Sequence, residues 1–590
     1  MHCNQAGRPA GRIIAMTANR WTSRRFLPAL ALGACALASL IATAQSRTPL
    51  SSADIDDIAT LVKLEDTRTL DEAALARILK STHTEVRRRA VVAVGRIAKE
   101  QGRPLLVGAR ADTEVEVLAS VAFATGQLKH PAAVEWLGGL LDNPRTSPIV
   151  GREAAQALGK IQTPDARAAL NRFVASVTDP DAVPVVGDAL LSLGRFTGRS
   201  DLTPIVRWLA YGDSEIRWRG AWALFRLRDP AGVPHLLKLA DDRSADVRYW
   251  AVRGLTPALV DQAALDRAAV SLRLRAAVKD NDRRVRTEAL RVLLTYDDDG
   301  AFAELLAALK STDTWVSTSA AEAASRFASR APALTPALIT AGEPDKPLWL
   351  RHTVLTPLVT LSAGAAIDVA TSMAREDSAV ARASAVQAFG RLGAAGRARL
   401  DELSAEPALK GLLPTSGAGR GGGGAGGAPQ PAAPVRTDAD YRRLVEKWIV
   451  PDYNGRPRPR AIWQTVRGTI ELELFAGDAP MGAEYFMKSI ESGDIVGTEF
   501  GRVVPNFVAQ QNGIRNAPRL RDEVNRRGLT EATLAWASAG LDTGRPGYTL
   551  STTPQPHNEG NFTALGRIVR GLDVMDKLEW GDTIVSARIK

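Results

Sequence analysis

Cysteine is almost absent from this chain of 590 residues, which contains only Cys3 and Cys35. Both lie near the amino terminus, so a chain that loses its first 44 residues has no disulfide and no thiolate metal site. The six histidines do not lie at the spacings typical of zinc ligands. We therefore expect neither a thiolate metal site nor a zinc enzyme.

Charge of one sign is not concentrated either. The chain has 75 Lys and Arg against 65 Asp and Glu, a net charge of +10, and acidic residues are interspersed among the basic ones. A nucleic-acid groove needs basic residues clustered on one face, so we interpret the excess as a solvated basic surface and expect no nucleic-acid partner. Apolar residues make up 45% of the chain, which excludes wholesale disorder. The length predicts at least two domains.

Long hydrophobic runs are scarce. An apolar run from Phe26 to Ile41 follows Arg24-Arg25 and precedes Ala42-Thr43-Ala44, the order of a basic segment, an apolar segment and a cleavage site. The run is short for a membrane span. We therefore expect residues 1–44 to be a signal peptide and the protein to be exported, periplasmic or secreted. Two alternatives stay open: a retained anchor, and a lipoprotein attached to the membrane through Cys35.

Residues 51–410 contain an internal repeat. One order of apolar and small residues recurs at spacings of 31 to 38 residues and once at 65, a gap that accommodates a degenerate unit near Leu350. The units begin at Val86, Val117, Val150, Val185, Ile216, Val247, Val285, Val316 and Ala381. Apolar positions three and four residues apart indicate helices, and two short helices bury their apolar face only by stacking. The segment resembles HEAT-like repeats, which implies an all-α solenoid.

Charged and aromatic residues recur within these units. An arginine follows the first residue of several units, at Arg87, Arg217, Arg248, Arg286 and Arg382, and acids precede it at Glu85, Glu215 and Asp246. These residues predict either a basic binding surface or ion pairs between neighbouring repeats. Trp218 and Tyr249 share one repeat position, and they predict either an exposed pair that binds a partner or core packing. We expect an unidentified protein partner on the repeats.

A change of composition separates the repeats from the rest of the chain. Eight of the eleven residues from Gly417 to Gly427 are glycine, so we expect residues 411–437 to be a flexible linker. Such a tether transmits no packing, which predicts that the two halves fold independently. A helix capped by Thr437 or Asp438 should follow, and then a hairpin that turns at Arg467-Gly468.

The remaining residues, 438–590, carry the most specific motifs. These are GTIELELFAGDAPMGAEYFMKSIESG at 468–493, GTEFGRVVPNFVAQ at 497–510, ASAG at 537–540 and PHNEGNFTALGRIVRG at 556–571. In this order they resemble the cyclophilins, which are peptidyl-prolyl cis-trans isomerases. The resemblance covers about residues 462–590. It implies a mainly-β domain, a closed antiparallel barrel of eight strands with two helices.

The same resemblance implies the site residues. Arg502 matches the catalytic arginine, Phe507 matches the aromatic floor of the proline pocket, and Gln510 matches the glutamine that orients the arginine. Further substrate contacts are implied for Phe500, Val508, Ser538, Thr549, His557, Asn558 and Phe562. No nucleophile, metal or cofactor is needed, because isomerisation breaks no bond.

The proline pocket departs from the family pattern. Thr549 stands where a second aromatic is expected, Gly547 where a glutamine is expected, and His557 where many members have tryptophan. We expect Phe562 to refill the apolar volume that Thr549 vacates. The sequence therefore predicts an exported isomerase that acts on proline-containing polypeptides, assists their folding and binds clients or partners through its repeats. The alternative is a catalytically weak module that binds proline peptides.

Overall fold

The computed structural model describes residues 47–413, 435–514, 518 and 520–590. The expected signal peptide, with Cys3 and Cys35, and the glycine-rich part of the expected linker lie outside these residues. Residues 50–590 form one compact unit, apart from residues 1–49. In the described part of the chain, no helix has both the length and the apolar character needed to cross a membrane.

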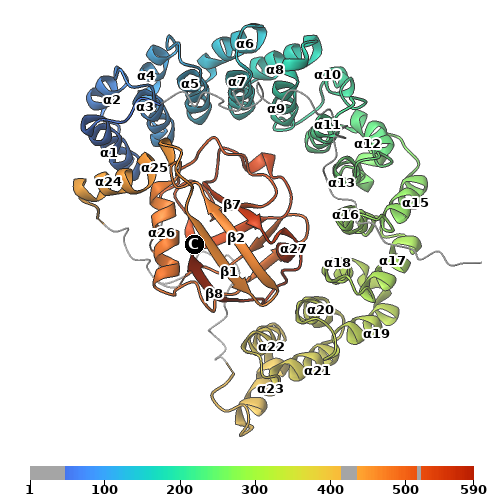
Figure 1. Cartoon of the computed structure of the whole chain (residues 1–590). Coiled ribbons are helices and arrows are strands. Elements are labelled where there is room, and N and C mark those ends of the chain that lie inside the picture. Colours follow the sequence, from blue (N-terminus) through green and yellow to red (C-terminus); the bar gives the residue numbers. More distant parts are fainter. Residues whose placement is uncertain (1–46, 414–434, 515–517, 519) are drawn as a thin grey trace, which may run out of the picture. The chain divides into compact units, whose positions relative to one another are not determined.

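The sequence repeat corresponds to one set of helices. In each of these helices the first residue of the repeat unit is the third residue of the helix, and it is buried. Leu350 occupies this position in α20, so the degenerate unit is a repeat as well. The helices, which follow one another in Figure 1, are α3 (Thr84–Ile97), α5 (Val115–Leu128), α7 (Pro148–Ile161), α9 (Val183–Leu193), α11 (Ser214–Leu227), α13 (Ala245–Arg253), α16 (Arg283–Leu293), α18 (Thr314–Ala323), α20 (Leu348–Leu361) and α22 (Ala379–Arg391).

A second set of helices packs beside the first. Each helix of the first set contacts the next, and the second set covers the other side of the shared apolar core, as expected for stacked repeats. This set consists of α1 (Ser52–Thr67), α2 (Glu72–Ile78), α4 (Arg103–Ala109), α6 (Val134–Asp142), α8 (Pro164–Ser176), α10 (Thr203–Val206), α12 (Val233–Leu239), α14 (Pro257–Gln262), α15 (Arg267–Ala277), α17 (Asp299–Leu309), α19 (Ala331–Ala341), α21 (Ala363–Ala374) and α23 (Gly393–Ala405).

The arginines that follow the first residue of a unit connect neighbouring repeats. Arg217 pairs with Asp242, 2.8 Å away, and its Nη1 donates to the carbonyl oxygens of Tyr211 and Gly212. Its guanidinium therefore joins one repeat to the next and satisfies carbonyls of the preceding segment. The ion-pair interpretation is confirmed for four of the five predicted arginines, whose acids lie 25 to 32 residues further along the chain rather than before the arginine. The fifth, Arg382, lies 3.8 Å from Asp377, which precedes it. The equivalent pairs are Arg87–Asp112, Arg248–Asp280, Arg286–Asp313 and Arg351–Glu376.

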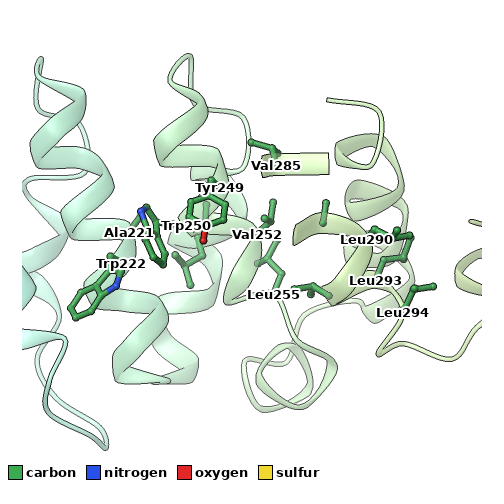
Figure 2. Packing of buried hydrophobic residues seen from close by; sticks show 14 of the residues in the cluster. Ala221, Trp222, Tyr249, Trp250, Val252, Leu255, Val285, Leu290, Leu293 and Leu294 are labelled. Carbon is green, nitrogen blue, oxygen red and sulfur yellow. The ribbon is translucent and has the colours of Figure 1, made fainter. Parts of the chain in front are cut away.

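The aromatic residues of these repeats lie in the core. Trp218 is 6% exposed and stacks on Trp250, with ring centroids 6.2 Å apart. Tyr249 is 1% exposed. Figure 2 shows Tyr249 and Trp250 of α13 between Trp222 of α11 and the leucines of α16. The predicted exposed pair is therefore wrong, and core packing is confirmed.

The C-terminal domain begins with a helix and continues as a barrel. Thr437 caps α24 (Asp438–Leu444) in a capping box with Asp440, which satisfies two free backbone donors. The predicted hairpin between β1 and β2 is confirmed, but it turns at Val466-Arg467, one residue before the predicted Arg467-Gly468, because Gly468 already pairs with Thr465. The elements are α25 (Val450–Tyr453), β1 (Arg460–Thr465), β2 (Gly468–Leu474), α26 (Pro480–Glu491), β3 (Arg502–Val504), β4 (Val508–Gln510), β5 (Thr533–Ala537), β6 (Arg545–Ser551), the 3₁₀ turn η7 (Pro556–Asn558), β7 (Ala564–Arg570), α27 (Leu572–Met575) and β8 (Ile584–Ile589).

All eight strands form one antiparallel sheet, in the order β3-β4-β6-β5-β7-β2-β1-β8. Strands β7, β2, β1 and β8 are labelled in Figure 1. The edge strands β3 and β8 are joined through the residues that precede them. Glu499 bridges to Thr583, and Phe500 exchanges backbone hydrogen bonds with Gly581 and Asp582. These bonds bring the sheet edges together, so the sheet curls around a core that includes Trp463, Trp536 and Tyr548.

The two halves are packed together, contrary to the prediction of independent halves. Helix α24 packs against α1, where the Tyr441 hydroxyl donates to Asp66 at 2.8 Å. Arg96 of α3 is 8% exposed and donates to the backbone oxygens of Val524 and Asp478, at 2.8 and 2.7 Å, and to the carboxylate of Glu65. These buried polar contacts, together with the apolar cluster that α1–α5 share with the C-terminal domain, hold the two halves together.

Candidate functional site

A short hairpin positions the three predicted catalytic side chains. Arg502 begins β3 and Gln510 ends β4, and the two residues are direct cross-strand partners. Between the strands, Asn506 adopts a left-handed backbone conformation (φ 59°), and Phe507 N donates to Val504 O. Asparagine tolerates this conformation at low cost. The turn therefore places Phe507 beside the two cross-strand partners.

The three side chains lie within contact of one another. Arg502 Nη1 donates to Gln510 Oε1 at 3.3 Å, and the Arg502 guanidinium carbon lies 5.4 Å from the centre of the Phe507 ring. Arg502 is exposed, whereas Phe507 and Gln510 are half-buried. Partial burial holds the pKa of Arg502 below its usual range, although arginine remains cationic in proteins. The structure thus brings the predicted arginine, aromatic and glutamine into one site.

His557 extends this site from η7. Its ring stacks on Phe507, with centroids 6.2 Å apart and an interplanar angle of 20°. Burial lowers the pKa of His557 to about 4, and the nearby Arg226, Arg195 and Arg253 add to this effect. The imidazole is therefore neutral at physiological pH, and it widens the flat surface of Phe507 without adding charge.

Other predicted contact residues border the site with their polar groups already engaged. Thr549 is the cross-strand neighbour of Gln510 and its hydroxyl donates to Ala535 O at 3.3 Å. Asn558 donates to Gln555 Oε1 at 2.8 Å, and Ser538 Oγ lies 3.1 Å from Thr543 Oγ1. These bonds hold the rim of the site in place.

Two predicted substrate contacts are buried instead. Phe500 has no exposed surface and belongs to the barrel core, so its predicted contact with substrate is wrong. Val508 is 4% exposed, so its side chain lies beneath the surface of the site. Phe562 packs against a small apolar cluster that includes Ala535, the cross-strand neighbour of Thr549.

Sequence reasoning missed Gln555, which supports the site through hydrogen bonds to residues on both sides of it. Its Nε2 donates to Phe507 O at 2.8 Å, and its Oε1 accepts from Asn558. Gln555 thereby connects the turn that carries Phe507 to η7. It is 4% exposed, so it is a positioning residue rather than a surface contact. A glutamine between two prolines, Pro554 and Pro556, is the sequence signal that could have drawn attention to it.

The helical repeats also reach this site, which the sequence analysis did not foresee. The Tyr249 hydroxyl donates to Asn506 O at 3.2 Å, and Asn506 Nδ2 donates to Arg284 O at 3.0 Å. Arg195 Nη2 donates to Pro556 O at 2.7 Å. Helices α13 and α16 thus hold the turn before Phe507, and Arg195, just after α9, holds the η7 turn that carries His557.

A recurring basic residue is the signal that could have revealed this face. It stands ten positions after the first residue of the unit, at Arg96, Lys160, Arg195, Arg226, Arg326 and Arg391. Arg96 and Arg195 donate to backbone oxygens of the C-terminal domain. Lys160 lies next to Gly560. The residue before it is often glycine, which lets neighbouring helices approach closely.

The described residues contain no group of three His, Cys, Asp or Glu side chains that could hold a metal ion. The site offers instead a guanidinium fixed by a glutamine, next to the faces of Phe507 and His557. Such a surface suits a flat, apolar ring with an adjacent atom that accepts a hydrogen bond.

Comparison with known proteins agrees with this geometry. Residues 461–590 match the family described as "Cyclophilin type peptidyl-prolyl cis-trans isomerase", and residues 103–184 and 184–256 match HEAT repeats. A peptidyl-prolyl cis-trans isomerase of Synechococcus elongatus is 33% identical over 138 residues, which are 22% of this chain and 95% of that protein. One of Helicobacter pylori is 35% identical over 133 residues, 21% of this chain and 82% of that protein.

Solved structures that resemble the chain include a cyclophilin-type isomerase of Cryptosporidium parvum. It is 18% identical, with a TM-score of 0.21, and the match covers 22% of this chain and 97% of that one.

Proposed function

Since the chain belongs, through residues 461–590, to the cyclophilin-type peptidyl-prolyl cis-trans isomerases, we propose that it isomerises Xaa–Pro bonds in exported polypeptides while they fold. The observation that carries this proposal is the contact between Arg502, Gln510 and the face of Phe507. The three residues lie on one hairpin, and the guanidinium is exposed to an incoming peptide.

The proposed mechanism is stabilisation of a twisted amide. Rotation about a peptide bond has a barrier of about 18–20 kcal/mol, because the planar amide is stabilised by resonance. When the amide twists, its nitrogen regains a lone pair and accepts a hydrogen bond. With the proline ring on Phe507, Arg502 donates to that nitrogen. This bond is stronger in the twisted state than in either planar state, which is the condition for catalysis.

Gln510 has a positioning role in this mechanism. Its Oε1 accepts from Arg502 Nη1, which fixes the guanidinium before the peptide arrives. A preorganised donor needs no reorientation as the amide twists. The neutral His557, stacked on Phe507, adds apolar surface for residues that flank the proline.

The export part of the proposal rests on the sequence of residues 1–44, and the client part on the helical repeats. HEAT-like repeats stack into extended surfaces that other proteins use for binding. Here the repeats contact the turn before Phe507, so a client held on the repeats is close to the isomerase site. We propose a periplasmic or secreted location, with Cys35 as the point of attachment if the chain is a lipoprotein.

A second function is favoured by two departures from the family pattern, at Thr549 and Gly547. Thr549 replaces an aromatic and uses its hydroxyl within the sheet. A side chain at Gly547 would start 3.0 Å from Gln511 O, so the backbone leaves little room for one. A smaller apolar pocket holds proline less firmly, and the domain would then bind proline peptides with little turnover.

The test is the substitution Arg502→Ala in the full chain, with isomerisation of a proline peptide measured by exchange NMR. One lost transition-state donor costs about 2–4 kcal/mol, so we expect kcat/KM to fall about 10- to 1000-fold. The matched control is Arg567→Ala, since Arg567 is also exposed and forms one ion pair with Glu473. An unchanged rate in folded Arg502→Ala contradicts the mechanism. Wild-type protein that binds the peptide without accelerating exchange supports the second function.

A further inference from the structure

Arg226 differs from Arg96 and Arg195, which stand at the same repeat position. Arg96 and Arg195 donate to carbonyl oxygens of the C-terminal domain. Arg226, near the end of α11, is exposed and lies over the Trp222 ring, with its guanidinium carbon 5.8 Å from the ring centre. Within the described part of the chain its guanidinium makes neither a hydrogen bond nor an ion pair. It is therefore a cation that is held in place but not neutralised.

Arg226 is exposed, and its charge reaches the ring next to the proline site. It acts electrostatically on His557, whose ring stacks on Phe507. Burial and the neighbouring Arg253 and Arg228 lower the pKa of Arg226 itself. A positive charge beside other positive charges favours the approach of an anion.

Three further arginines of the repeats line the same edge. Arg195 donates to Pro556 O, and Arg291 donates to Pro505 O at 3.5 Å. Arg253 donates to the Tyr249 hydroxyl, which donates in turn to Asn506 O. We call Arg195, Arg226, Arg253 and Arg291 the basic rim.

Carboxylates compensate the basic rim only in part. Glu288 lies 3.7 Å from Arg253, Glu559 acts on Arg195, and Glu322 lies close enough to feel the charge of Arg291. Arg226 has no such neighbour among the described residues. The rim is therefore least compensated at Arg226, whose charge acts on His557, the ring stacked on Phe507.

From this arrangement we propose that the helical repeats determine the sequence preference of the isomerase: the basic rim, centred on Arg226, selects proline segments that carry Asp or Glu beside the proline. This inference rests on the proposed function and extends it to a substrate class. A flanking carboxylate would lie near Arg226 when the proline ring lies on Phe507. Because this charge pair is close to solvent, the preference weakens as salt rises.

The experiment uses the full chain and two sets of three peptides. In the first set the residue before the proline is Glu, Gln or Lys, and in the second set the residue after the proline is Glu, Gln or Lys. Isomerisation is measured by exchange NMR, and affinity by fluorescence anisotropy. In at least one set we expect kcat/KM to be about three- to ten-fold higher for Glu than for Gln, and lower still for Lys. This order should flatten at about 1 M salt.

The decisive variant is Arg226→Glu, with Arg226→Gln as the neutral intermediate. We expect the ratio of Glu to Gln peptide to fall towards one in Arg226→Gln and below one in Arg226→Glu. Arg326→Glu is the matched control, because Arg326 is exposed and stands at the same position of a later repeat unit, and it should keep the wild-type ratio.

The outcomes separate this inference from the proposed function. If the Glu, Gln and Lys peptides react alike, or if Arg326→Glu changes the ratio as much as Arg226→Glu, the inference is wrong while the isomerase function stands. If no peptide is isomerised, the proposed function is wrong, and the affinities of the same peptides decide the inference. Equal affinities for the Glu and Lys peptides would overturn it.

Discussion

At the scale of single residues, Glu559 shows how the docking of the two halves depends on charge. It lies in the loop after η7 and lines, with Asp188 and Arg219 of the repeats, a cavity of about 460 Å³ between the halves. Burial, with the charge of Asp188, raises the pKa of Glu559 to about 7, against the opposing effect of Arg195, Arg219 and Lys160. Near neutral pH this carboxylate is therefore partly protonated in the folded protein.

This pKa predicts a pH dependence of stability. In the unfolded chain Glu559 has a pKa near 4.5, so only the folded protein takes up a proton there as the pH falls through about 7. Stability from this group therefore rises between about pH 8 and pH 5. We expect Glu559→Gln to be more stable than wild type at pH 8, with a difference that shrinks as the pH falls.

The measurement is the free energy of urea unfolding as a function of pH for both proteins. His352 and His557, whose pKa values are lowered to about 4, act in the opposite direction below about pH 6.5, but they are present in both proteins and cancel in the difference. Glu491→Gln, at an exposed helix position, is the control and should follow wild type at all pH values. Parallel curves for wild type and Glu559→Gln would contradict this pKa assignment.

At the scale of helices, small residues set the spacing of the repeats. A Cβ atom added to Gly95 would lie 2.7 Å from Ala124, one added to Gly126 2.8 Å from Ala157, and one added to Gly159 2.6 Å from Ser192. Successive helices from α3 to α9 therefore touch backbone to backbone. Arg96 and Lys160, which follow Gly95 and Gly159, are thereby held at a fixed spacing on the side of the repeats that contacts the C-terminal domain.

This close packing predicts opposite effects for one substitution at two sites. Gly159→Ala forces α7 and α9 apart or distorts them, and overpacking typically costs about 1–3 kcal/mol. Gly139→Ala, in α6, meets no atom within 4 Å and should stabilise by about 0.5–1 kcal/mol through helix propensity. Urea unfolding of the two variants measures both effects. Equal stabilisation by both would show that the helices are not in close contact.

At the scale of the whole molecule, buried polar contacts make residues 50–590 one unit. Arg526 pairs with Glu153 and Glu116 of the repeats, at 2.8 and 2.9 Å. The Trp580 and His352 rings stack at 3.8 Å. Arg96 adds the most buried of these contacts, because it pairs with Glu65 while it serves two carbonyl oxygens of the C-terminal domain. The isomerase domain is therefore held in a defined position against the repeats.

We predict that the two halves remain together when the chain is cut. A protease site placed within residues 414–434 removes the covalent connection, and the two fragments should still elute as one species in size-exclusion chromatography. Arg96→Ala leaves Glu65 buried without its partner, so we expect it to weaken association of the fragments by about 3 kcal/mol or more. Arg172→Ala, which breaks the exposed pair with Asp142, should have no measurable effect. Separate elution of the wild-type fragments would contradict this prediction and support the prediction, made from the linker, that the two halves are independent.

The sequence by itself determined the local structure and the chemistry of the hairpin. The repeat frame located ten helices, because a buried residue every three or four positions is a property of the helix itself. Other local features were likewise predictable, because each depends on residues close together in the chain. They are the cap at Thr437, the turn at Arg467 and the positions of Arg502, Phe507 and Gln510.

Only the tertiary structure determined which surfaces meet. Arg96 and Arg226 occupy the same place in their repeats, yet one donates to buried carbonyl oxygens and the other lies beside the proline site. Their surroundings come from residues more than 300 positions away, and a repeat pattern contains no information about them. The burial of Phe500 follows from closure of the barrel, which joins segments about 80 residues apart. Contacts of this kind depend on how complete elements pack, so the basic rim could be found only in the folded chain.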